Sequence, residues 1–163
     1  MSCLAEAVMS LAYEYESKER DIRARTPPRR LIGARDVVVG FVGSRIQLTP
    51  TQRDEITNIL RALDVAEVRH GDCFGADAEF HDIATTLGLS IVVHPPVNRT
   101  LRVHKTETTL RPKPYARRNR DIVDAIDVLI ACPKESEEQP LSGVWAAVQY
   151  ARKRGKKVQL ITP

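Results

Sequence analysis

The chain has 163 residues and a formal net charge of +4, and its cysteines Cys3, Cys73 and Cys132 are far apart in sequence. The length allows one domain with a core, and no apolar run approaches the ~20 residues that cross a membrane. The odd, scattered cysteines argue against a disulfide framework and a cysteine-based metal site, so we expect a cytoplasmic protein without metal or other cofactor. The positive charge points to an anionic small molecule or nucleic acid as partner, unless it belongs only to a solvated surface.

The first predicted element is a helix over residues 1–25, whose apolar residues recur at helical spacing: Leu4, Val8, Leu11 and Tyr15. Pro27 and Pro28 end this segment, because proline donates no backbone hydrogen bond. We expect residues 1–35 to form a helical extension that packs on the remaining domain, residues 36–163, or on a second subunit. The apolar stripe is consistent with a homodimer, and packing on the same chain is the alternative that explains it more simply.

Residues 37–42 form a continuous apolar run, which is typical of a strand buried on both faces of a parallel sheet. A helix is predicted next, with Thr49 as N-cap, Pro50 in the first turn and Gln52 completing a capping box. A second, shorter strand is predicted over residues 65–69.

A second helix of this domain is predicted to begin at Ala76 and to stop at Gly88, and a third strand over residues 89–93. The connection that follows, residues 95–113, has little periodicity, and loops of this length are usually functional or disordered. It carries five cations: Arg99, Arg102, Lys105, Arg111 and Lys113.

A third helix is predicted from Pro114, a fourth strand over residues 127–132, a helix capped by Ser142, and a fifth strand over residues 157–161. Strands that alternate with helices indicate a parallel sheet with helices on both faces. We therefore predict a Rossmann-like three-layer α/β/α fold with a five-stranded parallel sheet in the order 3-2-1-4-5, preceded by the N-terminal helix.

Small, polar and cationic residues gather in loops at the ends of the predicted strands. They are Gly43, Ser44 and Arg45; Gly71, Asp72, Gly75 and Asp77; Arg118 and Asn119; and Ser142 and Gly143. Because ligands of open α/β sheets bind beyond the carboxyl ends of the strands, we expect these residues to form one composite site. Small residues beside arginine suit a phosphate, since backbone N–H groups and helix N-termini can approach the anion closely.

The common nucleotide-binding fingerprints are missing from this sequence. Residues 40–45, Gly-Phe-Val-Gly-Ser-Arg, lack the third glycine of Gly-x-Gly-x-x-Gly, and no Gly-x-x-x-x-Gly-Lys-Ser/Thr occurs. A standard dinucleotide dehydrogenase and a P-loop NTPase are therefore disfavoured.

The order and spacing of the loop motifs resemble the SLOG superfamily. The matching motifs are Gly-Ser-Arg after the first strand, His-Gly-Asp-x-x-Gly-Ala-Asp after the second, Arg-Asn before an Ile-Asp-Val-Leu-Ile strand, and Ser-Gly at the next helix start. The resemblance covers about residues 37–162 and is nearer to the YspA/YpsA-like branch than to the LOG-type nucleotide phosphoribohydrolases. It implies a Rossmann-like domain that binds a nucleotide or nucleotide-derived ligand, with Arg118 at the position of a LOG-like arginine.

The resemblance also implies an alternative, hydrolysis of the N-glycosidic bond of a nucleoside monophosphate. The LOG motif resembles Pro-Gly-Gly-x-Gly-Thr-x-x-Glu, whereas residues 141–147 are Leu-Ser-Gly-Val-Trp-Ala-Ala and lack the catalytic glutamate. Since an N-glycosidase needs an acid and a stabilising carboxylate, this alternative would require Asp72 or Asp77. A third alternative is a nucleic-acid-binding module in which the basic residues 99–113 follow the phosphates.

Several of these residues also have purely structural explanations. Arg118 would clamp a phosphate or lie on the surface, and Asn119 would bind ribose or cap a backbone. Gly71 and Gly75 permit a tight turn whatever the function, and Asp77 suits the first turn of a helix without any ligand.

Four further side chains have open roles at this stage. His70 and His94 end neighbouring strands and would be an acid/base or structural groups. Cys73 would be a nucleophile only if something activated it. Trp145 would stack on a base or belong to an interface.

Overall fold

The computed structural model describes residues 37–103, 105 and 107–163. The helix predicted over residues 1–25, and with it the extension of residues 1–35, lies outside the described residues. None of the described helices is both long and apolar enough to span a membrane.

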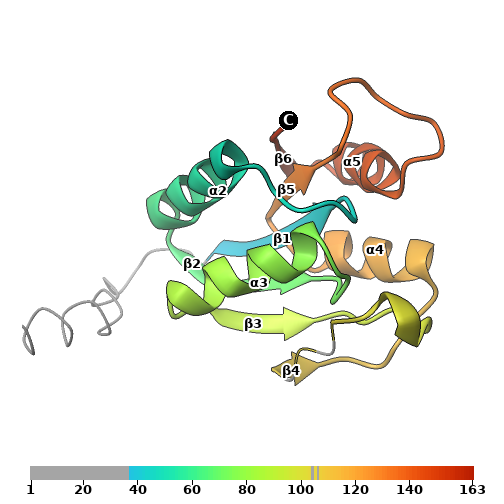
Figure 1. Ribbon diagram of the computed structural model, residues 1–163, viewed down its shortest axis with the longest axis horizontal. Helices are drawn as coiled ribbons and strands as arrows, with labels where there is room; N and C mark the ends of the chain where they lie inside the picture. The colour runs from blue at the N-terminus through green and yellow to red at the C-terminus, as the bar shows by residue number, and fades with distance from the viewer. Residues whose placement is uncertain (1–36, 104, 106) are drawn as a thin grey trace, which may run out of the picture. The chain divides into compact units, whose positions relative to one another are not determined.

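One parallel sheet forms the centre of the described part of the chain (Figure 1). Its strands are β1 (Val37–Gly43), β2 (Val65–His70), β3 (Ser90–Val93), β4 (Thr108–Thr109), β5 (Val128–Cys132) and β6 (Lys157–Leu160). Their order is β4-β3-β2-β1-β5-β6, and every neighbouring pair is parallel.

The three-layer α/β fold and the order of the five predicted strands are confirmed. The strand β4 was not predicted, because it is only two residues long and lies in the connection over residues 95–113. It extends the sheet by pairing with β3, Val92 with Thr108 and Val93 with Thr109.

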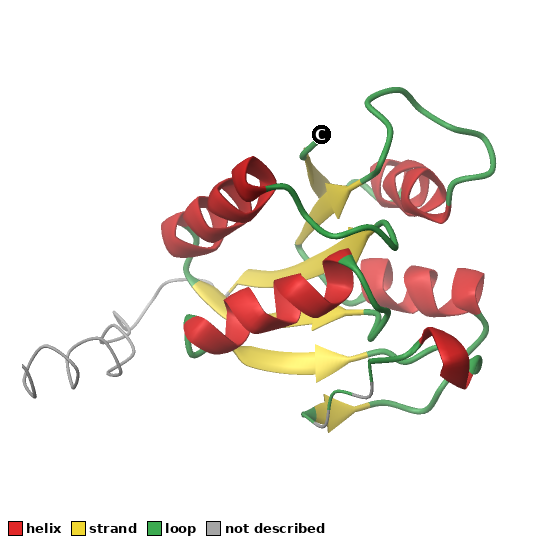
Figure 2. Ribbon diagram, in the orientation of Figure 1, coloured by secondary structure: helices red, strands yellow, loops and turns green. Residues whose placement is uncertain are grey.

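Helices cover both faces of the sheet (Figure 2). They are α2 (Pro50–Ala62), α3 (Ala76–Thr86), α4 (Tyr115–Asp124) and α5 (Gly143–Lys153), with a short 3₁₀ turn, η1 (Arg99–Leu101), after β3. The predicted capping box starts α2, where Thr49 Oγ1 accepts from Gln52 N at 3.2 Å and Gln52 Oε1 accepts from Thr49 N at 2.9 Å.

Two apolar clusters, one on each face of the sheet, form the core. On the α2/α3 face, Phe41 stacks on Phe80 with ring centroids 4.3 Å apart. On the α4/α5 face, Val42 packs with Ile122 and Val148. Alternate residues of β1 thus reach opposite faces, as the period of a strand requires, and this explains why its whole run is apolar.

The direction of the connections reverses between β1 and β5. From β1 the chain crosses to β2 on one side, while β5 and β6 lie on the other side of β1. Beyond the carboxyl ends of these two strands the loops diverge, and this is where open α/β sheets bind ligands.

Candidate functional site

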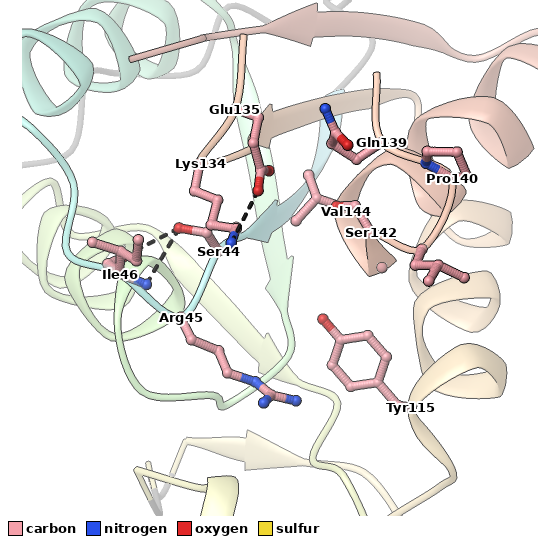
Figure 3. Close-up of a pocket in the computed structure, with 13 residues that line it drawn as sticks. Ser44, Arg45, Ile46, Tyr115, Lys134, Glu135, Gln139, Pro140, Ser142 and Val144 are labelled. Carbon is pink, nitrogen blue, oxygen red and sulfur yellow. Dashed lines mark hydrogen bonds and ion pairs between the residues drawn. The ribbon is translucent and has the colours of Figure 1, made fainter. Parts of the chain in front are cut away.

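A pocket of about 920 Å³ opens at this reversal (Figure 3). Its walls come from the loop after β1, the connection from β5 to α5, and the first residue of α4. Five residues of the predicted composite site line it: Gly43, Ser44, Arg45, Ser142 and Gly143. The loop after β1 and the start of α5 thus lie together at one pocket, and their contact with a ligand stays a prediction.

The loop after β1 is fixed by its backbone. Ser44 N donates to Cys132 O at 3.0 Å, and Ser44 O accepts from Ala76 N at 3.2 Å. Gly43 must lack a side chain here, because a Cβ atom would lie 2.4 Å from Ala76 Cβ. This close packing holds the loop against the start of α3.

Arg45 is the cation that this loop presents. Gly75, with φ +85°, packs directly on its backbone, since a Cβ atom on Gly75 would lie 2.4 Å from the Arg45 carbonyl carbon. The Arg45 side chain is exposed, and Figure 3 shows its guanidinium group on the same side of the pocket as Tyr115. The tightly packed loop after β1 thus presents the exposed Arg45 guanidinium group at the pocket.

The N-terminus of α5 forms another wall. Ser142 is its N-cap, and its Oγ accepts from Trp145 N at 3.4 Å. The first turn of a helix leaves backbone N–H groups without intrahelical partners and carries partial positive charge. Together these features make the start of α5 suitable for an anion.

Tyr115 lines the pocket, and the sequence analysis did not predict it as a site residue. Its ring closes on the start of α5, because a Cβ atom on Gly143 would lie 2.5 Å from Tyr115 Cε1. Figure 3 shows its hydroxyl group directed into the pocket. Burial raises the pKa of this phenol, so it is a neutral hydrogen-bond donor at physiological pH. Nothing in the local sequence distinguished Tyr115 from a core aromatic residue.

Lys134 and Glu135 line the pocket from the connection after β5 and were also missed. Their side chains form an ion pair with Lys134 Nζ 3.0 Å from Glu135 Oε1. The only sequence signal for a site here was their position, since the two residues come two and three positions after the end of a buried strand.

Arg118 lies inside the protein and is only 3% exposed. Its Nη1 is 3.7 Å from Asp77 Oδ2, its Nη2 donates to Cys73 Sγ at 3.3 Å, and its guanidinium lies 4.7 Å from the Tyr115 ring centre. Gly71 leaves the room for it, because a Cβ atom there would lie 1.1 Å from Nη1. Arg118 is not among the residues that line the pocket, and its contact with a phosphate stays a prediction.

Asp77 is buried beside Arg118. Its Oδ2 accepts from Gly71 N at 3.1 Å and from Cys73 N at 3.2 Å, which closes the loop after β2. Burial raises the pKa of Asp77, while the Arg118 guanidinium opposes the shift.

Asp72 is buried in the same loop, with a left-handed φ of 56°. Its carboxylate accepts from Arg102 Nε at 2.7 Å and from Lys105 N at 3.0 Å. Neither Asp72 nor Asp77 lines the pocket, so the hydrolytic alternative receives no pocket carboxylate from them.

Asn119 connects the two helices beside the pocket. Its Nδ2 donates to Gly143 O at 3.4 Å, whereas its buried Oδ1 has no partner among the described residues. This contact ties α4 to the start of α5.

The two strand-end histidines are buried, and each has a side-chain partner in the fold. His70 Nε2 lies 2.9 Å from His81 Nδ1, and His81 Nε2 lies 2.9 Å from Glu107 Oε1. His94 Nε2 lies 3.5 Å from Arg69 Nη1, and burial and Arg69 lower the pKa of His94 to about 4. These contacts favour the structural explanation for both strand-end histidines.

Cys73 and Trp145 are buried as well. Burial raises the pKa of the Cys73 thiol, which disfavours a thiolate nucleophile. Trp145 packs with the core of the α4/α5 face, away from the pocket lining.

Within the described ranges, no cluster of three or more histidine, cysteine or acidic residues could hold a metal ion.

Most cations of the 95–113 connection have carboxylate partners in the fold. Besides the Arg102–Asp72 pair, Lys105 Nζ lies 2.7 Å from Asp82 Oδ1, and Lys113 pairs with Asp121. Only Arg99 and Arg111 have no ion pair within the part of the chain that the structure describes. A nucleic-acid contact by this connection would thus depend on few cations.

Comparison with known proteins gives a likeness of fold. No family model matches the chain, and no curated protein does either. The X-ray structure of TM1055, a structural genomics target, is 18% identical with a TM-score of 0.55, over 75% of this chain and 72% of that one. DNA processing protein A (DprA) from Streptococcus pneumoniae is 17% identical with a TM-score of 0.57, over 77% of this chain and 50% of that one.

This chain therefore spans about half the length of DprA. At these identities, the two comparisons together establish that the described chain has a Rossmann-type three-layer α/β fold.

Proposed function

We propose that the pocket binds a nucleotide or nucleotide-derived ligand, with its phosphate at the first turn of α5. The observation that carries this proposal is the place of the pocket, at the reversal of the sheet where the start of a helix and the exposed Arg45 meet. Its volume of about 920 Å³ falls within the ~300–1,000 Å³ of small-molecule sites.

The anion end of the pocket combines three kinds of donor. The backbone N–H groups at the start of α5 offer partial positive charge, and Arg45 offers a planar guanidinium that binds phosphate through two hydrogen bonds. The neutral Tyr115 hydroxyl adds a donor between them (Figure 3). An uncharged ligand would use none of these charge-assisted contacts.

The proposal extends to the class of protein. The loop motifs that resemble the SLOG superfamily supply Ser44, Arg45 and the start of α5, so we infer a SLOG-type binding or sensing domain. Binding without turnover is favoured over N-glycosidic hydrolysis, because Asp72 and Asp77 are each held in internal hydrogen bonds outside the pocket.

A binding screen tests the proposal. Purified protein is screened by thermal shift against nucleoside mono-, di- and triphosphates, ADP-ribose and NAD, and each hit is incubated and analysed for free base. We expect stabilisation by at least one nucleotide without release of base. No stabilisation by any phosphate-bearing compound would refute the proposal, and released base would make the protein a hydrolase.

Arg45→Ala is the matched test of the anion end. We expect the dissociation constant for the best nucleotide to rise at least about tenfold, because a charge-assisted contact contributes about 1.5–3 kcal/mol. Arg99→Ala is the control, since it removes another exposed positive charge that lies outside the pocket lining. Equal losses in the two variants would mean that only net charge matters.

A further inference from the structure

One residue of the pocket does not fit a purely anionic ligand. Glu135 is the single carboxylate among the residues described as lining the pocket, which otherwise contribute Arg45 and Lys134 as charged groups. Figure 3 shows the Glu135 side chain directed into the pocket beside Ser44. A phosphate alone would be repelled by this group.

Only one oxygen of the Glu135 carboxylate has a partner among the described residues. Its Oε1 pairs with Lys134 Nζ at 3.0 Å, and its Oε2 has no hydrogen-bond partner among the described residues. The side chain is 32% exposed, so a ligand can reach it. An ionised carboxylate only accepts hydrogen bonds, and it therefore needs a donor on the ligand.

The pocket thus has two chemically different ends. The start of α5 and Arg45 suit an anion, while Glu135 suits a group that carries hydroxyl donors. The rim adds exposed apolar side chains, with Ile46 58% exposed and Leu141 fully exposed, which suit the flat apolar face of a base. In a nucleotide the group between phosphate and base is the sugar, whose cis hydroxyls are donors.

We propose that Glu135 accepts hydrogen bonds from the ribose hydroxyl groups of the ligand, so that the pocket selects ribonucleotides over 2′-deoxyribonucleotides. This inference rests on the proposed function, because it presupposes a phosphate at the start of α5. Lys134 acts as a positioning residue that holds the Glu135 carboxylate in place through the ion pair.

Equilibrium binding to the full chain tests the selection. The probes are the four ribonucleoside monophosphates, the 2′-deoxy form of each, and inorganic phosphate. Wild-type protein should bind its preferred ribonucleotide at least about tenfold more tightly than the 2′-deoxy form, since a hydrogen bond to a charged group is lost.

Glu135→Gln should lower the preference for ribonucleotides without weakening the binding of inorganic phosphate. We expect the ratio of ribo to 2′-deoxy affinity to fall below about threefold, because the amide retains only a neutral acceptor. Inorganic phosphate should bind this variant as tightly as wild type or more tightly, because a like charge has left the pocket. A purely structural role of Glu135 would weaken all probes together.

Glu137→Gln is the matched control, since it makes the same change in the same connection outside the pocket lining. It should leave every affinity unchanged. Nucleotide binding without sugar selection, selection that persists in Glu135→Gln, or equal weakening of phosphate and ribonucleotide would overturn the role of Glu135 while the proposed function stands. Failure of wild type to bind any phosphate-bearing probe would overturn both.

Discussion

At the scale of single residues, Arg118 shows how one cation can organise a site from within. It contacts Asp77, Cys73 and the ring of Tyr115, and only a glycine at position 71 leaves space for it. Because Tyr115 lines the pocket and Arg118 does not, the guanidinium supports the pocket wall from behind. Its effect on a ligand would be indirect.

Replacing this cation should destabilise the protein. Arg118→Met keeps most of the side-chain volume but leaves Asp77 buried without its cation, and we expect a loss on the order of 3 kcal/mol in the free energy of unfolding. Adding Asp77→Asn should recover part of that loss, since the unpaired carboxylate is then gone. Urea denaturation of the single and double variants measures this coupling, and purely additive losses would contradict it.

At the scale of elements, the loop after β2 anchors the long connection from β3 to α4. Asp72 receives Arg102 Nε and the Lys105 backbone N–H, and its carbonyl accepts from Val103 N at 3.0 Å. Phe74 N also donates to Leu101 O at 3.2 Å, next to η1. The connection is thus held by hydrogen bonds rather than by an apolar face.

Asp72→Asn isolates the charge in this anchor, because asparagine also tolerates the left-handed φ of 56°. We expect a loss of about 1–3 kcal/mol in the free energy of unfolding and faster hydrogen exchange at the amides of Val103 and Lys105. Exchange should remain slow at Val93, in the sheet core. Unchanged protection of the two connection amides would count against the anchor.

At the scale of the whole molecule, buried histidines link stability to pH. Burial lowers the pKa of His70 and of His94, the latter to about 4, so the folded state binds fewer protons than the unfolded chain below pH 6.5. Each contributes stability that is present above the unfolded pKa and lost as pH falls. The raised pKa of Asp77 acts in the opposite sense.

Comparing wild type with His94→Gln isolates the contribution of His94 to the pH dependence of stability. As pH falls from 6.5 to about 4, wild type should lose unfolding free energy relative to this variant, by up to about 1.4 kcal/mol per pH unit. Denaturation curves at several pH values measure it. A difference that stays constant with pH would show that His94 titrates equally in both states.

Much of this architecture could be predicted from the sequence, for identifiable reasons. The apolar run of β1 and the capping box at Thr49 are local signals, and the order of the strands follows from the alternation of strands and helices. The strand β4 could not be predicted, because two threonines without periodicity give no local signal.

The site was predictable only in part. Ser44, Arg45 and Ser142 follow strands directly or start a helix, and so their place at the pocket could be inferred. Arg118 and Asp72 belong to equally polar motifs, yet they pair inside the fold, and a sequence does not reveal which ionic groups find internal partners.

The row of hydrogen bonds from Asp72 through His70 and His81 to Glu107 has a single polarity. The Asp72 N–H donates to His70 Nδ1 at 3.1 Å, so a neutral His70 carries its proton on Nε2 and donates to His81, which in turn donates to Glu107. Both rings are locked in one tautomer by a backbone amide. A second proton on His70 would lie on Nδ1 and oppose the Asp72 N–H, so protonation of His70 would break the row next to the loop after β2.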